Sequence, residues 1–366
     1  MGHPYPKNDC QWYGCWDEKR FLTDGITPTK VFILKAIILA GGSGKRFWPL
    51  SDKETPKQFL KLFGKESLIR NTYDRLRERF GPDEILVITN SLHVEMTGEH
   101  LPELPPGNII GEPVGRNTAP ACVIGAMAGG LEEIQLVVPA DHHISDTEEF
   151  WRSFDVGREA LEKEDMLITF GIEPRRPETG YGYIKKGEML NESLFMVKSF
   201  KEKPDRKTAA GYMESGKFFW NSGMFMWRGS TLLEEIRKYK PSIHSGLKGV
   251  DPRSGEGLEK AYGTLENISI DYAVMERSER VAMVRATFPW SDVGSWNAIR
   301  ELKGYSKEND CLLLEDSGDV FVQGLDRPVA VMGLEGVIVV DSPNGLLIMK
   351  EGKEQKVRKA YSRFVE

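Results

Sequence analysis

The chain has 366 residues, of which 40% are hydrophobic and 28% are charged, a composition that fits a folded protein with a sizeable core. This length predicts two domains. Its 49 basic and 55 acidic residues give a net charge of −6, which argues against a nucleic-acid binder because such proteins need positive charge against phosphate. No apolar run approaches the roughly 20 residues that a membrane-spanning helix needs. We therefore expect no nucleic-acid partner and no membrane attachment.

Residues 1–30 mix aromatic, charged and turn-forming residues without a clear period, and we interpret them as an N-terminal extension. The alternative is a short docked arm held by its aromatic side chains. A disulfide between Cys10 and Cys15, or a zinc site that uses both, is an alternative that the sequence supports only weakly. Because the four cysteines are few and scattered, we expect a reducing, cytoplasmic setting.

From residue 31 onward, patterns typical of buried strands alternate with helical spacing. The strands are predicted at residues 31–40, 84–90, 108–110, 136–141 and 166–172, and the helices at 67–80, 118–130 and 150–163. This alternation predicts a doubly wound, Rossmann-like α/β domain, which we expect to span residues 31–303. Ligands bind beyond the carboxyl ends of the strands in such sheets, and Gly41, Gly42 and Asp141 lie at two of these ends.

The pattern changes after Gly304. Short apolar runs such as DVFVQG, PVAVMG and GVIVVDS are separated by turn residues, and a helical period returns only at residues 354–364. We expect a small all-β, β-helix-like domain over residues 304–366. Its apolar faces favour packing on the first domain or on a second copy of the chain.

The glycine-rich segment GGSGKRF (residues 41–47) follows the first strand directly. Backbone N–H groups in such a turn can cradle an anion. Two common phosphate motifs fail here, because Leu39 stands where a P-loop needs its first glycine and Phe47 stands where a dinucleotide fingerprint needs its third. A plain tight turn is the alternative.

A longer segment decides between these interpretations. LAGGSGKRFWPLSDKETPKQFLKL (residues 39–62) resembles the signature of the sugar-1-phosphate nucleotidylyltransferases, L-A-G-G-x-G-x-R-x-x-P-L followed by P-K. Six more segments look like the bacterial mannose-1-phosphate guanylyltransferases. They are GEPVGRNTAPA (111–121), VVPADHHI (137–144), PETGYGYI (177–184), FKEKPD (200–205), WNSGMF (220–225) and FPWSDVGSW (288–296).

The resemblance implies transfer of GMP from GTP to mannose 1-phosphate, which gives GDP-mannose and diphosphate. It also implies a homodimer. Long members of this family carry an additional C-terminal isomerase domain, and we expect none here because the chain stops too soon. Two alternatives stay open: the same chemistry on another sugar 1-phosphate such as glucose 1-phosphate, and a non-catalytic nucleotide-binding regulator.

The nucleotide contacts are predicted in two segments. They are Leu39, Ala40, Gly41, Gly42, Ser43, Gly44, Lys45, Glu112, Asn117, Thr118 and Ala119. Glu112 bears on the choice of base, because guanine presents two neighbouring donors and an ionised carboxylate can accept both. Relatives that use thymine or uracil place a glutamine there. A glutamate that merely caps the turn before Pro113 is the alternative.

Three basic residues are the candidate catalytic groups. Arg46 is expected to stabilise the departing diphosphate, and Lys57 to offset charge on the α-phosphate. Lys203 is expected to hold the sugar phosphate. The nucleophile is already an anion, so the reaction requires no general base.

The resemblance places metal ligands at Asp141 and Asp292, where hard carboxylate oxygens suit Mg²⁺ (or Mn²⁺). His142 and His143 raise a zinc alternative, but neighbouring residues tend to point apart and no third soft ligand is evident.

The sugar contacts are expected from the middle of the chain. They are Gly180, Tyr181, Glu202 and Asn221. A glycine-containing loop lets backbone groups approach the ligand closely, and the carboxylate and amide can bond sugar hydroxyls. Taken singly, each is as easily a surface residue.

Overall fold

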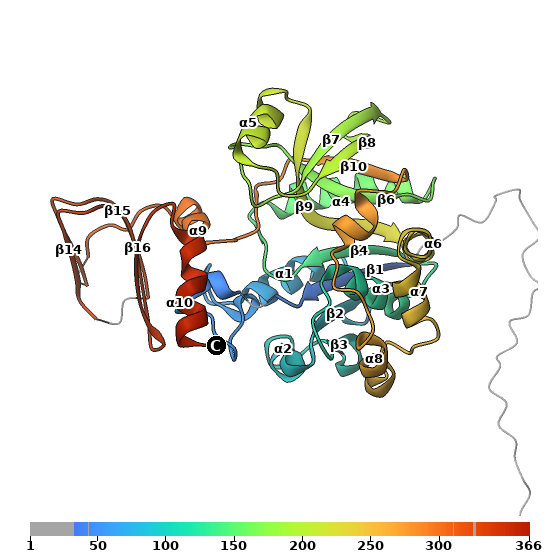
Figure 1. Cartoon of the computed structure of the whole chain (residues 1–366), viewed down its shortest axis with the longest axis horizontal. Helices are drawn as coiled ribbons and strands as arrows, with labels where there is room; N and C mark the ends of the chain where they lie inside the picture. The colour runs from blue at the N-terminus through green and yellow to red at the C-terminus, as the bar shows by residue number, and fades with distance from the viewer. Residues whose placement is uncertain (1–32, 43, 310, 325–326) are drawn as a thin grey trace, which may run out of the picture. The chain divides into compact units, whose positions relative to one another are not determined.

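The computed structural model describes residues 33–42, 44–309, 311–324 and 327–366 (Figure 1). The predicted extension at residues 1–30, with its two cysteines, and Ser43 lie outside the described residues. No helix in the described part is long and apolar enough to cross a membrane.

Nine strands of the described chain form one mixed sheet in the order β3-β2-β1-β4-β9-β6-β10-β8-β7. These strands are β1 (Leu34–Ala40), β2 (Ile85–Asn90), β3 (Ile109–Glu112), β4 (Ile134–Pro139), β6 (Leu167–Ile172), β7 (Tyr183–Met189), β8 (Leu194–Lys201), β9 (Phe218–Arg228) and β10 (Val281–Ala286). The β3-β2-β1-β4 block is parallel. Its central side chains are buried under helices, which explains the continuous apolar runs.

The helices that follow or flank these strands agree with the helical spacing of the sequence where it was evident. They are α1 (Leu68–Arg77), α2 (Val94–His100), α3 (Thr118–Gly129), α4 (Thr147–Leu161), α5 (Arg206–Glu214), α6 (Gly229–Tyr239), α7 (Pro241–Leu247), α8 (Gly255–Tyr262) and α9 (Trp296–Lys303). Side chains cap several of them: Ser67 accepts from the Arg70 N–H, and Asp146 from the Glu149 N–H. The predicted α/β fold is confirmed.

One strand departs from a simple doubly wound order. β9 lies between β4 and β6 and runs antiparallel to both, with Met226 paired to Leu136 on one side and to Ile168 on the other. The sequence marked only the motif in its middle, because pairing between segments so distant in the chain leaves no local signal. β7 and β8 then extend the far edge of the sheet.

The C-terminal β domain contains β12 (Leu312–Glu315), β13 (Gly318–Gln323), β14 (Val329–Met332), β15 (Glu335–Ser342) and β16 (Gly345–Lys350). Leu312 pairs in parallel with Val329, and Val320 pairs with Val337 at the same separation along the chain. These pairings are those of successive turns of a coil, so the β-helix-like prediction is confirmed. The chain then forms α10 (Val357–Phe364), inside the helical segment predicted at 354–364.

Candidate active site

The parallel strands deliver polar and glycine residues to one edge of the sheet. Gly41 and Gly42 follow β1, Glu112 is the last residue of β3, and Asp141 lies just beyond β4. Because parallel strands end on the same side, these residues converge, as the sequence predicted from two of the strand ends. A single-turn helix, η1 (Lys45–Phe47), completes the glycine-rich segment after β1.

A short ribbon brings the two predicted metal ligands together. β5 (His143–Ile144) pairs with β11 (Trp290–Ser291), so that each predicted ligand stands next to one of its strands. Lys57 Nζ lies 2.7 Å from Asp141 Oδ2 and also donates to the Asp292 carbonyl at 2.7 Å. The Lys57 side chain is only 8% exposed, so this ammonium group ties the two aspartates together in a largely dry position.

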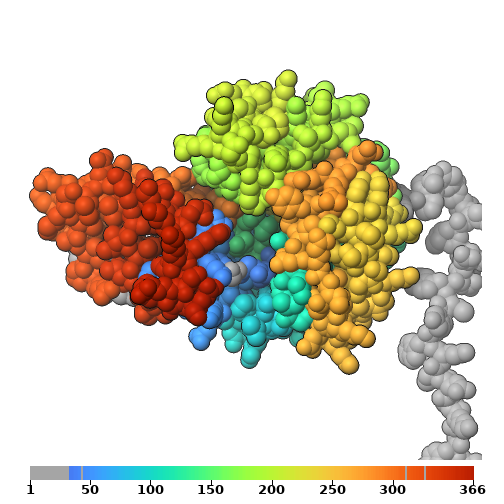
Figure 2. Space-filling view, viewed as in Figure 1, coloured from blue at the N-terminus to red at the C-terminus, as the bar shows by residue number. Residues whose placement is uncertain are grey.

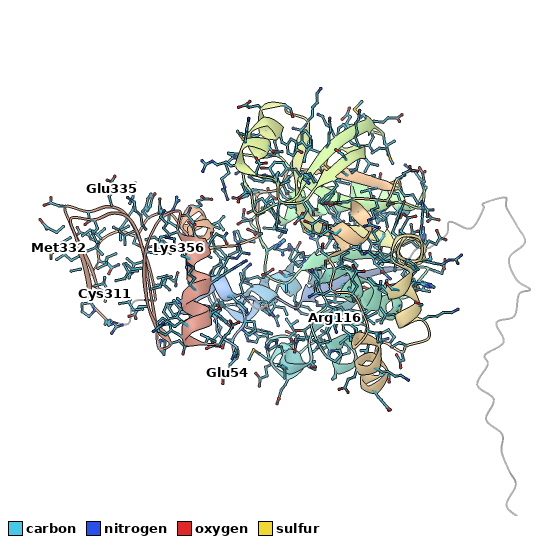
Figure 3. The ribbon with its side chains drawn as sticks, in the orientation of Figure 1. Glu54, Arg116, Cys311, Met332, Glu335 and Lys356 are labelled. Atoms are coloured by element: carbon cyan, nitrogen blue, oxygen red, sulfur yellow. The ribbon has the colours of Figure 1, made fainter. Side chains whose placement is uncertain are left out.

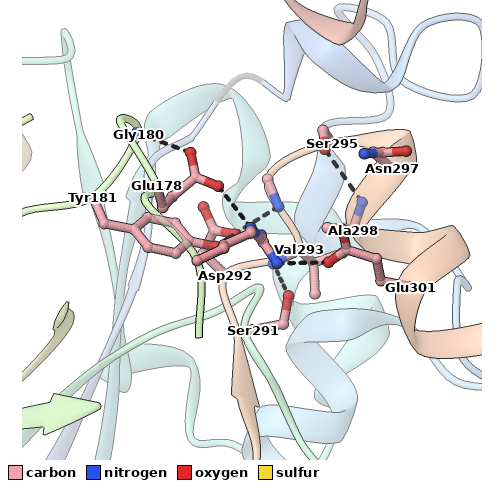
Figure 4. A network of polar contacts seen from close by, with 12 residues as sticks. Glu178, Gly180, Tyr181, Ser291, Asp292, Val293, Ser295, Asn297, Ala298 and Glu301 are labelled. Carbon is pink, nitrogen blue, oxygen red and sulfur yellow. Dashed lines mark hydrogen bonds and ion pairs between the residues drawn. The ribbon is translucent and has the colours of Figure 1, made fainter. Parts of the chain in front are cut away.

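The Asp292 carboxylate is fixed by a local network (Figure 4). Its Oδ1 accepts a hydrogen bond from Tyr181 Oη at 2.8 Å and another from the Gly294 N–H at 2.9 Å. Val293 between them has a φ of 48°, a left-handed conformation that a β-branched residue rarely adopts. Strain of this kind persists only where neighbouring contacts impose it, and it clusters at functional sites.

The two aspartates fit a divalent cation. Burial alone would raise the pKa of Asp141, but Lys57 and His142 outweigh it and hold that pKa below its usual range. The described residues contain no group of three His, Cys, Asp or Glu that could hold a metal. A pair of carboxylates with the remaining ligands taken from phosphate and water is the arrangement typical of Mg²⁺.

The histidines next to Asp141 have partners of their own. His142 Nδ1 accepts from Trp290 Nε1 at 3.2 Å, and burial lowers the pKa of His142 to about 4. His143 stacks on Phe63 with ring centroids 4.3 Å apart.

A cavity of about 540 Å³ opens between the glycine-rich segment and the aspartates, and we call it the phosphate cavity. Its lining residues are Gly42, Gly44, Lys45, Arg46, Phe47, Lys57, Asp141, His142, Asp292, Gly294, Arg358 and Ser362. Gly44 has a φ of 62°, and a Cβ there would lie 2.5 Å from Lys57 Cβ, so only glycine fits. Arg46 forms no ion pair or side-chain hydrogen bond with any other described residue, which leaves it open to an anion.

A second cavity of about 340 Å³ adjoins the first, since Gly42 and His142 line both. We call it the base cavity, and the predicted nucleotide residues that line it are Leu39, Gly41, Gly42, Glu112, Asn117 and Thr118. Asn117 adopts a φ of 66° and caps α3 by accepting from the Thr118 N–H. Ala40 and Ala119 are buried and line neither cavity.

Glu112 is one of two acidic residues on the wall of the base cavity. Its side chain is buried, and its Oε1 accepts from Tyr262 Oη at 3.0 Å. Burial raises the pKa of Glu112 to about 7, because a charged carboxylate is costly where water is excluded. The loop that carries this residue is anchored by Arg116, whose Nε donates to the Tyr262 carbonyl at 2.9 Å (Figure 3).

The predicted sugar residues come from three places: Gly180 and Tyr181 precede β7, Glu202 follows β8, and Asn221 lies in β9. Gly180 and Tyr181 line a third cavity of about 210 Å³, which shares Arg46 and Asp292 with the phosphate cavity. The Lys203 ammonium pairs with Glu202, and the Lys203 N–H donates to the Tyr181 carbonyl at 3.2 Å.

Asn221 is held in place by a buried acid. Its Nδ2 donates to Asp271 Oδ1 at 2.8 Å, and its Oδ1 accepts from Thr169 Oγ1 at 3.0 Å. Burial raises the pKa of Asp271 to about 6, with the nearby Glu202 charge acting in the same direction. Asp271 also lines the base cavity.

Three residues at the site were not predicted from the sequence. They are Tyr262, Asp271 and Arg358. Each comes from a helix or turn distant in the chain from the segments it contacts. The segment ISIDYAVME offered a signal for Asp271, since an isolated acid inside an apolar run needs a polar partner when buried.

Comparisons with known proteins agree with this arrangement. The profile of the family described as Nucleotidyl transferase matches residues 35–308, and that of the MannoseP isomerase/GMP-like beta-helix domain matches residues 313–363. Alginate biosynthesis protein AlgA of Pseudomonas fluorescens is 38% identical over 344 residues, covering 89% of this chain and 71% of that protein. The mannose-1-phosphate guanylyltransferase of Escherichia coli is 36% identical over 346 residues, covering 90% and 73%.

A solved structure is similar to this chain over most of its length. The crystal structure described as mannose-1-phosphate geranyltransferase from Thermus thermophilus superposes with a TM-score of 0.82 at 32% identity. The match covers 90% of this chain and 98% of that one, so it includes both the α/β sheet and the β domain.

The buried carboxyl of Glu112 leads to a prediction about stability and pH. Because its pKa of about 7 exceeds the ordinary value of 4.5, the folded state binds the proton more tightly than the unfolded state between these values. The free energy of unfolding should therefore fall as pH rises, by up to about 1.4 kcal/mol per pH unit from this group. Glu112→Gln keeps an acceptor for Tyr262 and removes the titration, so it should become more stable than wild type at pH 8 but not at pH 5. Chemical unfolding at both pH values measures this, and an equal difference at both would contradict it.

Proposed function

We propose that this chain, which belongs to the nucleotidyl transferase family, transfers GMP from GTP to α-D-mannose 1-phosphate and releases diphosphate. The observation that carries the proposal is the continuity of the base cavity with the phosphate cavity. A buried glutamate lies in the first, and a lysine with two aspartates lies in the second. The similarity to the mannose-1-phosphate guanylyltransferase of Escherichia coli supports the choice of substrates.

In the reaction, a phosphate oxygen of mannose 1-phosphate attacks the α-phosphorus of GTP in line. The new P–O bond forms as the bond from the α-phosphorus to the bridging oxygen of diphosphate breaks, and diphosphate takes the electron pair. Positioning and charge neutralisation are therefore the whole task of the protein. Lys57 stands next to the α-phosphate in this arrangement, and Arg46 next to the leaving diphosphate. A Mg²⁺ ion (or Mn²⁺) held by Asp141 and Asp292 would neutralise phosphate charge when bound.

Glu112 supports GTP as the nucleotide. The N1–H and N2–H groups of guanine can both donate to its carboxylate, and Oε1 can accept a further bond beside the one from Tyr262. These donors favour the ionised form and so lower the pKa of the carboxyl on binding. A pyrimidine base offers no such pair of donors.

The sugar phosphate is assigned to the third cavity, which Tyr181 lines and which shares Arg46 and Asp292 with the phosphate cavity. Lys203 would turn from Glu202 to the sugar phosphate, while Asn221 and Glu202 bond sugar hydroxyls. The polar partners of Asn221 fix its orientation and support this role, because a preoriented amide loses little entropy on binding. A cytoplasmic setting is part of the proposal, and the thiols of Cys122 and Cys311 are free.

A substrate panel tests the function. Purified protein with Mg²⁺ should release diphosphate from GTP and mannose 1-phosphate, and much more slowly when UTP, dTTP or ATP replaces GTP. Release with glucose 1-phosphate in place of mannose 1-phosphate would overturn the sugar assignment alone. Binding of GTP without turnover by any pair would favour a non-catalytic regulator.

The two aspartates lead to a prediction about metal binding. Asp292→Asn should lower kcat by at least about 100-fold, because an amide oxygen lacks the negative charge that would help to hold a divalent cation at this site. The affinity for Mn²⁺ in the presence of GTP, followed by electron paramagnetic resonance, should fall in parallel. Asp155→Asn is the matched control, since Asp155 pairs with Arg79 on the surface. Normal Mn²⁺ binding and turnover in Asp292→Asn would remove this residue from the metal site.

We also propose a homodimer through the β domain. This domain carries exposed apolar side chains that include Leu313, Met332 and Ile348, which are 48%, 59% and 62% exposed (Figure 3). Met332→Glu combined with Ile348→Glu should convert the dimer to a monomer in sedimentation equilibrium, whereas Met189→Glu on β7 should not, although Met189 is 64% exposed. A monomeric wild type would contradict the proposal.

A further inference from the structure

The C-terminal helix α10 is built into the wall of the phosphate cavity. It packs on η1 of the glycine-rich segment, where Lys45 Nζ lies 5.6 Å from the centre of the Tyr361 ring. Phe364 stacks on Trp48 with ring centroids 5.4 Å apart. Figure 2 shows the C-terminal residues in red packed against the residues near position 50 in blue.

One face of this helix points to the cavity. Arg358 and Ser362 are four residues apart, the spacing that aligns side chains along a helix, and Glu366 lies two residues beyond the end of α10. Arg358 and Ser362 line the phosphate cavity. Glu366 accepts a hydrogen bond from Ser362 Oγ at 2.8 Å and forms an ion pair with Lys45.

Of the basic side chains that line the phosphate cavity, some have a carboxylate partner and others do not. Lys45 and Lys57 each have a carboxylate partner, whereas the guanidinium groups of Arg46 and Arg358 have none among the described residues. Two guanidinium groups without an acidic partner, both lining one cavity, favour binding of an anion with several oxygens. A triphosphate is such an anion.

We propose that Arg358 binds the β- and γ-phosphates of the nucleotide, so that the C-terminal domain supplies part of the triphosphate site. α10 contributes to the phosphate cavity but to none of the lining of the base cavity, which places Arg358 at the end of the nucleotide away from the base. Glu366 acts as a competing anion that holds Lys45 until phosphate displaces it. The inference rests on the proposed function only in that a nucleoside triphosphate occupies this cavity.

The test compares ligands that share a base but differ in phosphate. In calorimetric titrations with Mg²⁺, Arg358→Ala should weaken binding of GTP and of inorganic diphosphate by at least about tenfold, the loss of one charge-assisted contact. Binding of GMP should stay unchanged, because GMP lacks the two outer phosphates. Glu366→Gln should bind GTP more tightly than wild type, since the competing charge is gone.

Lys359→Ala is the matched control, because this neighbouring cation on α10 does not line the cavity. An equal loss of GMP and GTP binding in Arg358→Ala would indicate a structural role and overturn the proposal, as would unchanged GTP binding. Weaker GTP binding in Glu366→Gln would overturn the competing role of that carboxylate. If the wild type prefers another nucleoside triphosphate in the substrate panel, the same titrations are repeated with that nucleotide and its monophosphate. They then test the role of Arg358 independently of the proposed choice of base.

Discussion

The buried ammonium group of Lys57 is the interaction on which the rest of the site depends. It holds the Asp141 side chain and the Asp292 main chain at once, although these two residues are far apart in the chain. Burial alone would raise the pKa of Asp141, and the Lys57 charge is the main cause that lowers it instead. Removing one partner of such a buried pair is costly, because the other charge is left without compensation. The ion pair therefore keeps Asp141 charged and holds the Asp292 main chain in place before any divalent cation arrives.

A second constraint on the site is the packing of the β domain against the segments that line the phosphate cavity. Phe47, Trp48 and Trp296 share one hydrophobic cluster with Ile338 and Tyr361 of the β domain. The end of the glycine-rich segment is thus anchored by residues that lie about 300 positions further along the chain. A glycine-rich turn gains the rigidity that anion binding needs from packing of its neighbours, because glycine itself provides none. In this protein the β domain is part of the active-site scaffold.

The sequence was sufficient to locate candidate site residues that lie in contiguous segments at the ends of strands. The turn after β1, the acid after β4 and the glutamate that ends β3 could all be located, because parallel strands bring their carboxyl ends together. Tyr262, Asp271 and Arg358 could not, since their roles depend on which distant segments pack against each other. The position of β9 between β4 and β6, antiparallel to both, could not be predicted for the same reason.

The pairing of the basic residues suggests how substrate enters so polar a site. The three lysines of the site each hold a carboxylate: Lys45 holds Glu366, Lys57 holds Asp141, and Lys203 holds Glu202. Arg46, by contrast, has no acidic partner among the described residues. A guanidinium group is weakly hydrated and tolerates this state better than an ammonium group does. On the proposed function, phosphate can bind Arg46 without displacing an internal carboxylate, whereas binding to each lysine exchanges a carboxylate for a phosphate oxygen.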